Sequence, residues 1–279
     1  MTGKLFVCAT PIGNLEDITI RVLKVLRQVD IIACEDTRRT GKLLQRYKIR
    51  KPMVSYHNYS SKNREDFLLQ ELLAGKNIVL VSDAGMPGIS DPGQWLVRQA
   101  IDQRIELEVL PGPSAFATAL VLSGYPADCF MFAGFLPSRS KARRERLQEL
   151  SKYPSAVIFY ESPHRLKETL SDMADIWGEQ RAMTAARELT KLHEEVIRGT
   201  IGEINRYFNE NLPRGEFCLI TAGYKAEQEK TDLARVEKEV KELLAQGIEK
   251  NKAFKMKALE YNVKKSDIYN YYHLHNLTE

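Results

Sequence analysis

Residues 78–93 read IVLVSDAGMPGISDPG, an apolar run of strand length followed at once by a loop with three glycines and two prolines. Such a loop is tight and lets a ligand approach the main chain closely. In open α/β sheets, ligands bind at the carboxyl ends of the strands. We therefore expect a strand at 78–81 and a ligand contact in the loop 82–93, where Asp83 and Met86 suit a polar, partly cationic ligand. The alternative is that the loop only connects two elements.

Apolar runs of strand length recur on both sides of this stretch, at 5–9, 29–34 and 107–110. The segments 20–29, 41–47, 65–73 and 95–103 between them carry apolar residues three and four apart, which is typical of helices. This alternation predicts a parallel sheet covered by helices.

A second series of strand-like runs follows, near 130–135, 156–160, 183–186, 196–199 and 217–222. The sequence thus predicts two α/β domains, at 1–124 and 125–225. Beyond residue 226 the strand signals stop, and the Glu/Lys-rich text predicts a helical extension, 226–279, with helices at 231–245, 251–261 and 265–274.

The helical extension resembles a helix-turn-helix in the spacing of its last two helices. Residues 248–272 contain six lysines but only three acidic residues, which gives a local excess of positive charge. Four tyrosines add aromatic surface. Two interpretations stay open: a small packing unit with solvated lysines, or a contact with nucleic acid.

Composition narrows the function classes. The chain has 279 residues, 43% of them hydrophobic, and a net charge of +4, so it can bury ordinary soluble cores. Its apolar runs are shorter than the roughly 20 residues of a membrane span, and no signal-peptide pattern is visible, so we expect a cytoplasmic protein without a membrane contact. The four cysteines lie far apart, and no cluster has metal-ligand spacing, so neither disulfides nor a metal site are expected.

Three further strand ends are expected to converge on the loop 82–93, at 10–19, 35–40 and 111–115. The loop 10–19 has a single glycine, which disfavours a nicotinamide or flavin enzyme, and the absence of a Gly-Lys-Ser/Thr phosphate loop disfavours an ATPase. The mixed charges at 35–40 indicate either local ion pairs at a helix start or a contact with substrate or cofactor.

Six motifs together carry a family resemblance: ATPIGNLEDIT at 9–19, EDTR at 35–38, SDAGMPGISDPG at 82–93, PGPSA at 111–115, GFLP at 134–137 and YESPHR at 160–165. They resemble, in matching order, the ribosomal RNA small-subunit methyltransferase I family of the tetrapyrrole-methylase superfamily. The resemblance implies two α/β domains with S-adenosyl-L-methionine in the cleft between them, in a homodimer. It also implies 2′-O-methylation of a cytidine ribose in the decoding centre, with 16S rRNA or the small ribosomal subunit as partner.

Site residues carry over from the resemblance position by position. Those that match cofactor contacts are Asp83, Gly85, Met86, Ser114 and Ala115, then Tyr160 and Glu161, with Pro11 on the loop that borders the cleft. The superfamily's Gly-Asp-Pro loop reads Ser82-Asp83-Ala84 here, which fits the RNA branch better than the porphyrin branch.

The chemistry needs a ribose oxygen aligned with the methyl donor, and a base that helps remove its proton. The segment 186–195 places charged side chains close together, and we expect Glu188 or Lys191 to engage the ribose and Arg187 a phosphate. The alternative is a surface turn held by ion pairs. Further RNA contacts are expected at Arg38, Arg165 and, on a basic helix at 138–152, Arg143 and Arg144, unless that helix is merely a solvated face.

Two other functions share some of these features. A methyltransferase for a small tetrapyrrole would use the same fold, but it gives the helical extension and the basic helix no purpose. A ligand-sensing regulator that binds DNA through the extension is the alternative outside enzymes.

Overall fold

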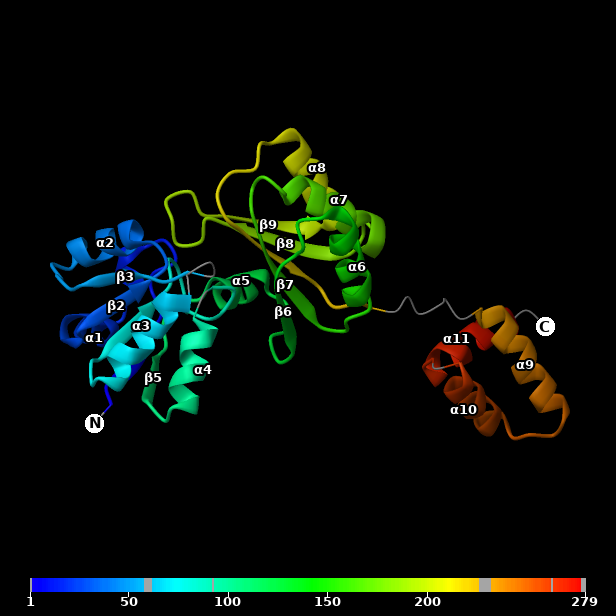
Figure 1. The fold of residues 1–279 in the computed structure, drawn as a ribbon. Helices are drawn as coiled ribbons and strands as arrows, with labels where there is room; N and C mark the ends of the chain where they lie inside the picture. The colour runs from blue at the N-terminus through cyan, green and yellow to red at the C-terminus, as the bar shows by residue number, and fades with distance from the viewer. Residues whose placement is uncertain (1, 58–61, 92, 226–231, 262, 277–279) are drawn as a thin grey trace. The chain divides into compact units, whose positions relative to one another are not determined.

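The computed structural model describes residues 2–57, 62–91, 93–225, 232–261 and 263–276. The chain forms two compact units, Met1–Tyr224 and Lys225–Glu279 (Figure 1). The first holds two five-stranded sheets and the second only helices among its described residues. Within the described residues, no helix combines the length and apolar character needed to cross a bilayer.

The first sheet is entirely parallel, as the alternating apolar runs predict. Its order is β3-β2-β4-β1-β5, and its strands are β1 (Lys4–Cys8), β2 (Ile31–Cys34), β3 (Met53–Ser55), β4 (Ile78–Val81) and β5 (Glu106–Leu110). No strand is expected from the sequence at β3, because three residues after a proline give too short a signal. The central strands β2 and β4 are buried throughout, as expected for strands covered on both faces.

Helices cover both faces of this sheet. Apolar residues of α1 (Ile20–Gln28) and α2 (Thr37–Arg46) pack on one face, and those of α3 (Lys62–Leu73) and α4 (Gln94–Asp102) form a separate core on the other. A 3-10 turn, η1 (Leu15–Asp17), precedes α1. Every strand therefore ends at the same edge, where the loops predicted to bind a ligand emerge.

The second sheet is mixed, with the order β6-β7-β10-β8-β9. Its strands are β6 (Phe130–Phe135), β7 (Ala156–Glu161), β8 (Ala182–Arg187), β9 (Glu195–Thr200) and β10 (Phe217–Thr221). Among the hydrogen-bonded strand pairs of this sheet, only β6 and β7 are parallel. Strand β10 runs antiparallel to both of its neighbours, β7 and β8, and β9 runs antiparallel to β8. The core on one face is built with α6 (Ser140–Leu150), α7 (Leu166–Trp177) and α8 (Ile201–Glu210) (Figure 1).

The other face of the second sheet is covered by α5 (Ala115–Ser123), whose Ala119 and Leu120 pack against Ile158 and Ile220. This helix directly follows the loop after β5 of the first sheet. By packing it belongs with the second sheet, although it precedes the domain boundary expected after residue 124. The boundary itself stays a prediction.

The second unit contains the three helices expected in the extension, α9 (Leu233–Ala245), α10 (Lys250–Glu260) and α11 (Lys265–Asn276). They share a small core of Val236, Val240, Ala253, Phe254 and Ile268. Asp232 accepts hydrogen bonds from two amides of the first turn of α9. The expected first residue of that helix, Thr231, lies outside the described residues.

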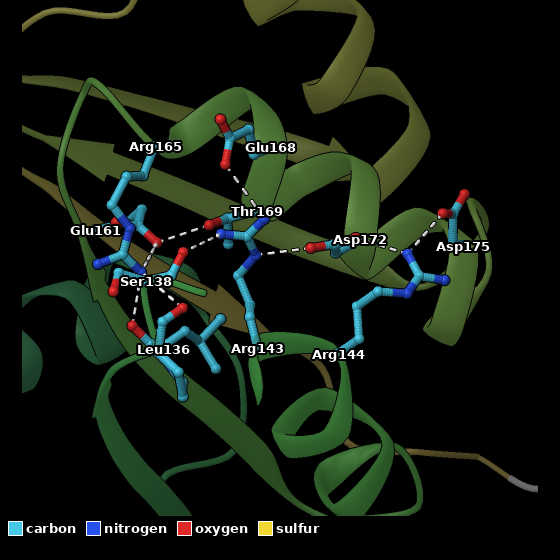
Figure 2. Close-up of polar contacts among 11 residues, drawn as sticks. Leu136, Ser138, Arg143, Arg144, Glu161, Arg165, Glu168, Thr169, Asp172 and Asp175 are labelled. Atoms are coloured by element: carbon cyan, nitrogen blue, oxygen red, sulfur yellow. Dashed lines mark hydrogen bonds and ion pairs between the residues drawn. The ribbon is translucent and has the colours of Figure 1, made fainter. Parts of the chain in front are cut away.

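Arginines of α6 face carboxylates of α7 (Figure 2). The Arg143 side chain is only 3% exposed; its Nε lies 2.6 Å from Asp172 Oδ2 and its Nη2 3.3 Å from Glu168 Oε2. Arg144 is 42% exposed, and its Nη1 lies 2.6 Å from Asp172 Oδ1 and 2.9 Å from Asp175 Oδ2. Arg143 is thus almost fully buried and held by carboxylates of α7, which argues against the RNA contact expected of it. For Arg144 that contact stays a prediction.

Removing Arg143 should destabilise the chain strongly, because the buried Asp172 would lose one of its two arginine partners and the space of the buried Arg143 side chain would be left empty. We expect Arg143→Ala to lower the free energy of unfolding by about 3 kcal/mol or more. Arg146→Ala is the matched control, since Arg146 and its partner Glu149 are 43% and 63% exposed. That variant should change stability by about 0.5 kcal/mol or less. Urea denaturation checks both, and equal losses would contradict the structural role of Arg143.

Candidate active site

Loops from both sheets line one cavity of about 310 Å³. From the first sheet come Ile12, after β1, and residues 84–86 and 89–91, after β4. The first turn of α5 adds Ser114, Ala115 and Phe116. The second sheet contributes Phe135, Tyr160, Glu161, Ser162, Pro163, Ala186, Glu188, Leu189, Lys191, Glu216, Phe217 and Cys218. Of the loops predicted to converge on 82–93, 10–19 and 111–115 line the cavity with it, whereas 35–40 contacts Asp83 outside the cavity lining. The cavity is one that neither sheet forms alone.

Main-chain hydrogen bonds join the loops after β1 and β4. The Thr10 amide donates to the Gly85 carbonyl at 2.9 Å, and the Gly85 amide donates back at 3.0 Å. The hydroxyl of Ser82 donates to the same Gly85 carbonyl at 3.1 Å. Gly85 adopts φ +81°, in the region that favours glycine. This pairing holds Gly85 and Met86 against the cavity.

The first turn of α5 meets the second sheet at Tyr160. The Phe116 amide donates to the Tyr160 hydroxyl at 3.2 Å, which satisfies one of the free amides of a helix start. The ring of Tyr160 packs edge-on against Phe132 and Phe135. Ser114 stands at the N-cap without a side-chain capping bond. Its hydroxyl therefore stays available at the cavity wall.

Three acidic side chains lie near one another at the loop 82–93: Asp83 and Asp91 of the loop itself, and Glu35 at the end of β2. Burial, together with the negative charge of Glu35, raises the pKa of Asp91 to about 7, although a hydrogen bond with Ser82 opposes the shift. Burial and the charge of Asp83 raise the pKa of Glu35, and burial raises that of Asp83. Asp91 lines the cavity, whereas Asp83 does not; it accepts a hydrogen bond from the Asp36 amide at 3.0 Å.

On the opposite wall, Lys191 bridges two carboxylates. Its Nζ lies 2.8 Å from Glu188 Oε1 and 2.9 Å from Glu216 Oε2. Burial lowers the pKa of Lys191, but these two hydrogen bonds outweigh it and raise the pKa. For Glu188 burial raises the pKa, yet the bonds from Lys191 and the Glu216 amide outweigh that and lower it. The pair is held as ammonium and carboxylate.

The loop after β1 also touches this wall. A Cβ added to Gly13 would lie 2.5 Å from Cγ of Lys191 and 2.8 Å from the Leu189 carbonyl oxygen, so only glycine allows the approach. The Asn14 amide donates to the Thr190 hydroxyl at 3.0 Å. Glu188 and Thr190 both have positive φ, 51° and 65°, which is uncommon outside glycine. The segment 188–191 is thus pinned in an unusual conformation beside the cavity.

Glu161 lines the cavity, but its carboxylate is used within the wall (Figure 2). It accepts hydrogen bonds from the Ser162 amide at 2.8 Å and the Thr169 hydroxyl at 2.7 Å. Arg165 lies 3.5 Å from the same carboxylate and donates to the Leu136 carbonyl at 2.6 Å. This carboxylate supports the wall, and Arg165 supports it with its guanidinium; the cofactor contact expected of Glu161 stays a prediction.

The other residues singled out from the sequence lie as follows. Gly85, Met86, Ser114, Ala115, Tyr160, Glu188 and Lys191 all line the cavity, whereas Pro11 and Asp83 stand behind it. Arg38 is 87% exposed and pairs with Asp36 beside the end of β2, and Arg187 lies 3.2 Å from Glu195. None of the RNA contacts expected of these arginines is tested by this geometry.

Sequence reasoning missed several wall residues, among them Ile12, Asp91, Leu189 and Glu216. Asp91 lies in the loop 82–93 that the sequence predicts to bind a ligand, but no sequence pattern distinguishes it from Asp83. Glu216 precedes β10, far in sequence from Lys191. Only the antiparallel pairing of β10 with β8 brings them together.

Comparison with known proteins matches this architecture to a family. The model of the family described as Tetrapyrrole (Corrin/Porphyrin) Methylases matches residues 4–205. The chain belongs to this family. Within it, the chain is 45% identical to a ribosomal RNA small subunit methyltransferase I of Synechocystis, covering 96% of each chain. The protein of that name from Bacillus subtilis is 43% identical, with 98% of this chain and 94% of that one covered.

Solved structures of lower identity share the fold. The methyltransferase CobJ superposes with a TM-score of 0.61 at 18% identity, covering 80% of this chain and 95% of that one. Uroporphyrin-III C-methyltransferase from Thermus thermophilus, complexed with S-adenosyl homocysteine, gives 0.56 at 14% identity, covering 79% of this chain and 97% of that one.

The chain is therefore an enzyme, a methyltransferase that uses S-adenosyl-L-methionine. The cavity fits this cofactor, since its volume of about 310 Å³ lies within the range of small-molecule sites. Ile12, Met86 and Phe116 give apolar walls for an adenine ring, and polar groups at the start of α5 suit polar ends. A sulfonium beside Asp91 would favour the ionised form of this carboxyl, whose pKa is otherwise raised to about 7.

The raised pKa of Asp91 predicts a pH-dependent stability. Its folded value of about 7 lies above the ordinary value of about 4, so the folded chain binds this proton more tightly. The resulting stabilisation is full below about pH 4 and is lost as pH rises through about 7. Stability measured by urea denaturation should therefore fall from pH 5 to 8 in the wild type relative to Asp91→Asn. Exposed Asp128→Asn should track the wild type; parallel curves for all three proteins would contradict the burial of Asp91.

Proposed function

We propose that this enzyme transfers a methyl group from S-adenosyl-L-methionine to the ribose 2′-oxygen of a cytidine in the decoding centre of 16S rRNA. The observation that carries the proposal is the shared cavity, with a cofactor wall on one side and the Glu188–Lys191–Glu216 cluster on the other. Methylation of ribosomal RNA is the coarser part, and it rests on membership among the small subunit methyltransferase I proteins. We further propose that it acts in the cytoplasm as a homodimer on 16S rRNA or the small subunit.

The tetrapyrrole alternative is less well supported. A uroporphyrin-III-C-methyltransferase and a cobalt precorrin-4 methyltransferase of known structure are 16% and 18% identical and share the fold alone. The relatives named for ribosomal RNA are 41–49% identical, most of them over nearly the whole chain. Because membership makes the chain a methyltransferase, the alternative of a DNA-binding regulator is set aside.

The cofactor is held by loop geometry in this proposal. Gly85 and Met86 contact it through the rigid loop after β4, and Ser114 and Ala115 through the start of α5. Tyr160 closes the second-domain side, while Asp83 and Pro11 shape the loops from behind. When bound, S-adenosyl-L-methionine supplies a methyl group on a positively charged sulfur.

Alignment is the main contribution of the chain. Holding the ribose oxygen in line with the methyl carbon can supply about 7–11 kcal/mol, whereas a positioned base adds about 10²–10⁴-fold. Glu188, with its lowered pKa, is a hydrogen-bond acceptor for the ribose hydroxyl and a modest base for its proton. Lys191 stays protonated and holds Glu188 in place. Arg187 and the helical extension 226–279 are proposed contacts with RNA phosphates.

The test uses the full-length enzyme, S-adenosyl-L-methionine labelled in its methyl group, and three acceptors: small ribosomal subunits, naked 16S rRNA and a porphyrinogen. We expect label in ribosomal RNA, at one nucleotide, and on the sugar after nuclease digestion. Label on a base would refute the ribose assignment. Label only on the porphyrinogen would refute an RNA substrate.

Glu188→Gln should slow methyl transfer at least tenfold while the dissociation constant for S-adenosyl-L-methionine stays unchanged. The reason is that glutamine keeps the size of the side chain but loses the proton acceptor and the ion pair with Lys191. Single-turnover rates with saturating cofactor measure the effect, and calorimetry measures cofactor binding. Exposed Glu210→Gln on α8 is the control. An unchanged rate in Glu188→Gln would remove Glu188 from the mechanism.

A further inference from the structure

A second basic region, not on α6, lies on α2 and the turn that leads to β3. Residues 37–51 contain seven arginines and lysines and no acidic residue. We call the last five of these cations, Lys42, Arg46, Lys48, Arg50 and Lys51, the α2–β3 basic surface. Four of them are exposed and Lys51 is partly exposed.

These five cations differ from the basic residues of α6 in their pairing. Arg38 and Arg39, the first two of the seven, pair with Asp36 and Asp83. Within the part of the chain that the structure describes, none of the other five forms an ion pair with a carboxylate. Arg143 and Arg144, by contrast, face carboxylates of α7. The positive potential on α2 is thus uncompensated, and such a surface attracts a polyanion.

A hollow of about 670 Å³ lies within this surface. Leu44, Ile49 and Met53 give it apolar lining, and Lys48, Arg50 and Lys51 give it cations. Leu44 and Ile49 are buried, while Met53 is 37% exposed. An apolar hollow with cations around it suits an unstacked base whose flanking phosphates meet the cations, as in proteins that bind single-stranded RNA.

Helix α2 connects the edge where the cavity opens to the opposite edge of the sheet, because β3 runs parallel to β2 and begins after the turn that follows α2. Helix α2 begins at the carboxyl end of β2, where the Asp36 amide donates to Asp83 of the loop after β4. Ten residues of helix span about 15 Å. A strand of RNA with one ribose in the cavity can therefore reach the basic surface with its neighbouring nucleotides.

We propose that the α2–β3 basic surface binds the phosphates of a single-stranded RNA segment next to the target nucleotide, and that its hollow accepts one unstacked base. This inference rests on the proposed function, because it assigns a docking site for the same substrate. It differs from the sequence-based expectation, which placed RNA along the helix at 138–152.

The test compares two variants of the full chain with equal loss of charge. In the surface variant, Lys42, Arg46, Lys48 and Arg50 are each replaced by Gln. In the control, four exposed cations on the opposite face of the same sheet, Lys62, Arg64, Arg98 and Arg104, are each replaced by Gln. The probe is a labelled RNA containing the decoding region of 16S rRNA, and its affinity is measured at several salt concentrations, with cofactor binding followed by calorimetry.

We expect the surface variant to bind this RNA at least tenfold more weakly than the wild type at 0.1 M salt. At this concentration the Debye length is about 10 Å, so charges in contact with phosphates are only partly screened. The slope of log affinity against log salt should fall by about 3, since each contact with a single strand contributes about 0.7. The control should keep RNA affinity within about threefold and an unchanged slope. Both variants should bind S-adenosyl-L-methionine as the wild type does.

Wild-type affinity in the surface variant, or an equal loss in both variants, would overturn the proposal. Failure of the proposed function gives a different result. In that case the wild type transfers no methyl group to ribosomal RNA, while the surface variant alone still loses RNA affinity.

Discussion

The site depends on the packing of one helix, α5, which follows the first sheet in the chain and packs on the second. Its N-terminus follows β5 of the first sheet, whereas Ala119 and Leu120 are buried against β7 and β10 of the second. Because this apolar contact cannot be lost without exposing both surfaces, it sets the distance between the loops of the two sheets. The hydrogen bond from the Phe116 amide to Tyr160 fixes the start of the helix at the cavity. The contact of Gly13 with the segment 188–191 closes the other side in the same way.

Charge is distributed over the cavity in a consistent pattern. Asp91, with Glu35 and Asp83 behind it, makes the first-sheet wall acidic, which suits a cationic methyl donor. On the second-sheet wall, Lys191 is shared by two carboxylates and cannot act as a base while it is so held. The site thus relies on position more than on proton transfer, in agreement with the larger share of the barrier that alignment can supply.

The contrast between α6 and α2 shows why a count of charges in a sequence misleads. Both segments are rich in arginine and lysine, but α6 packs beside α7, whose Glu168, Asp172 and Asp175 lie close to Arg143 and Arg144. Those partners are 25 to 31 residues away in sequence, so no local pattern predicts them. The segment 37–51 contains no acidic residue. Among the described residues, no carboxylate from elsewhere in the fold forms an ion pair with Lys42 or Arg46. Burial and pairing, rather than composition, separate a structural arginine from a docking surface.

Local patterns alone were sufficient for much of the first sheet. Apolar runs such as 78–81 mark buried parallel strands, and the glycines and prolines of 82–93 mark a ligand loop, because both depend on near neighbours in the chain. The loop motifs were also sufficient for the family. The tertiary structure alone decided four other features. These are the direction of β10, the pairing that brings Glu216 to Lys191, the burial of Arg143 and the hydrogen bonds of the Glu161 carboxylate within the wall. Each of these depends on contacts between different elements of the second sheet and its helices, so their contact energies exist only once those elements have packed.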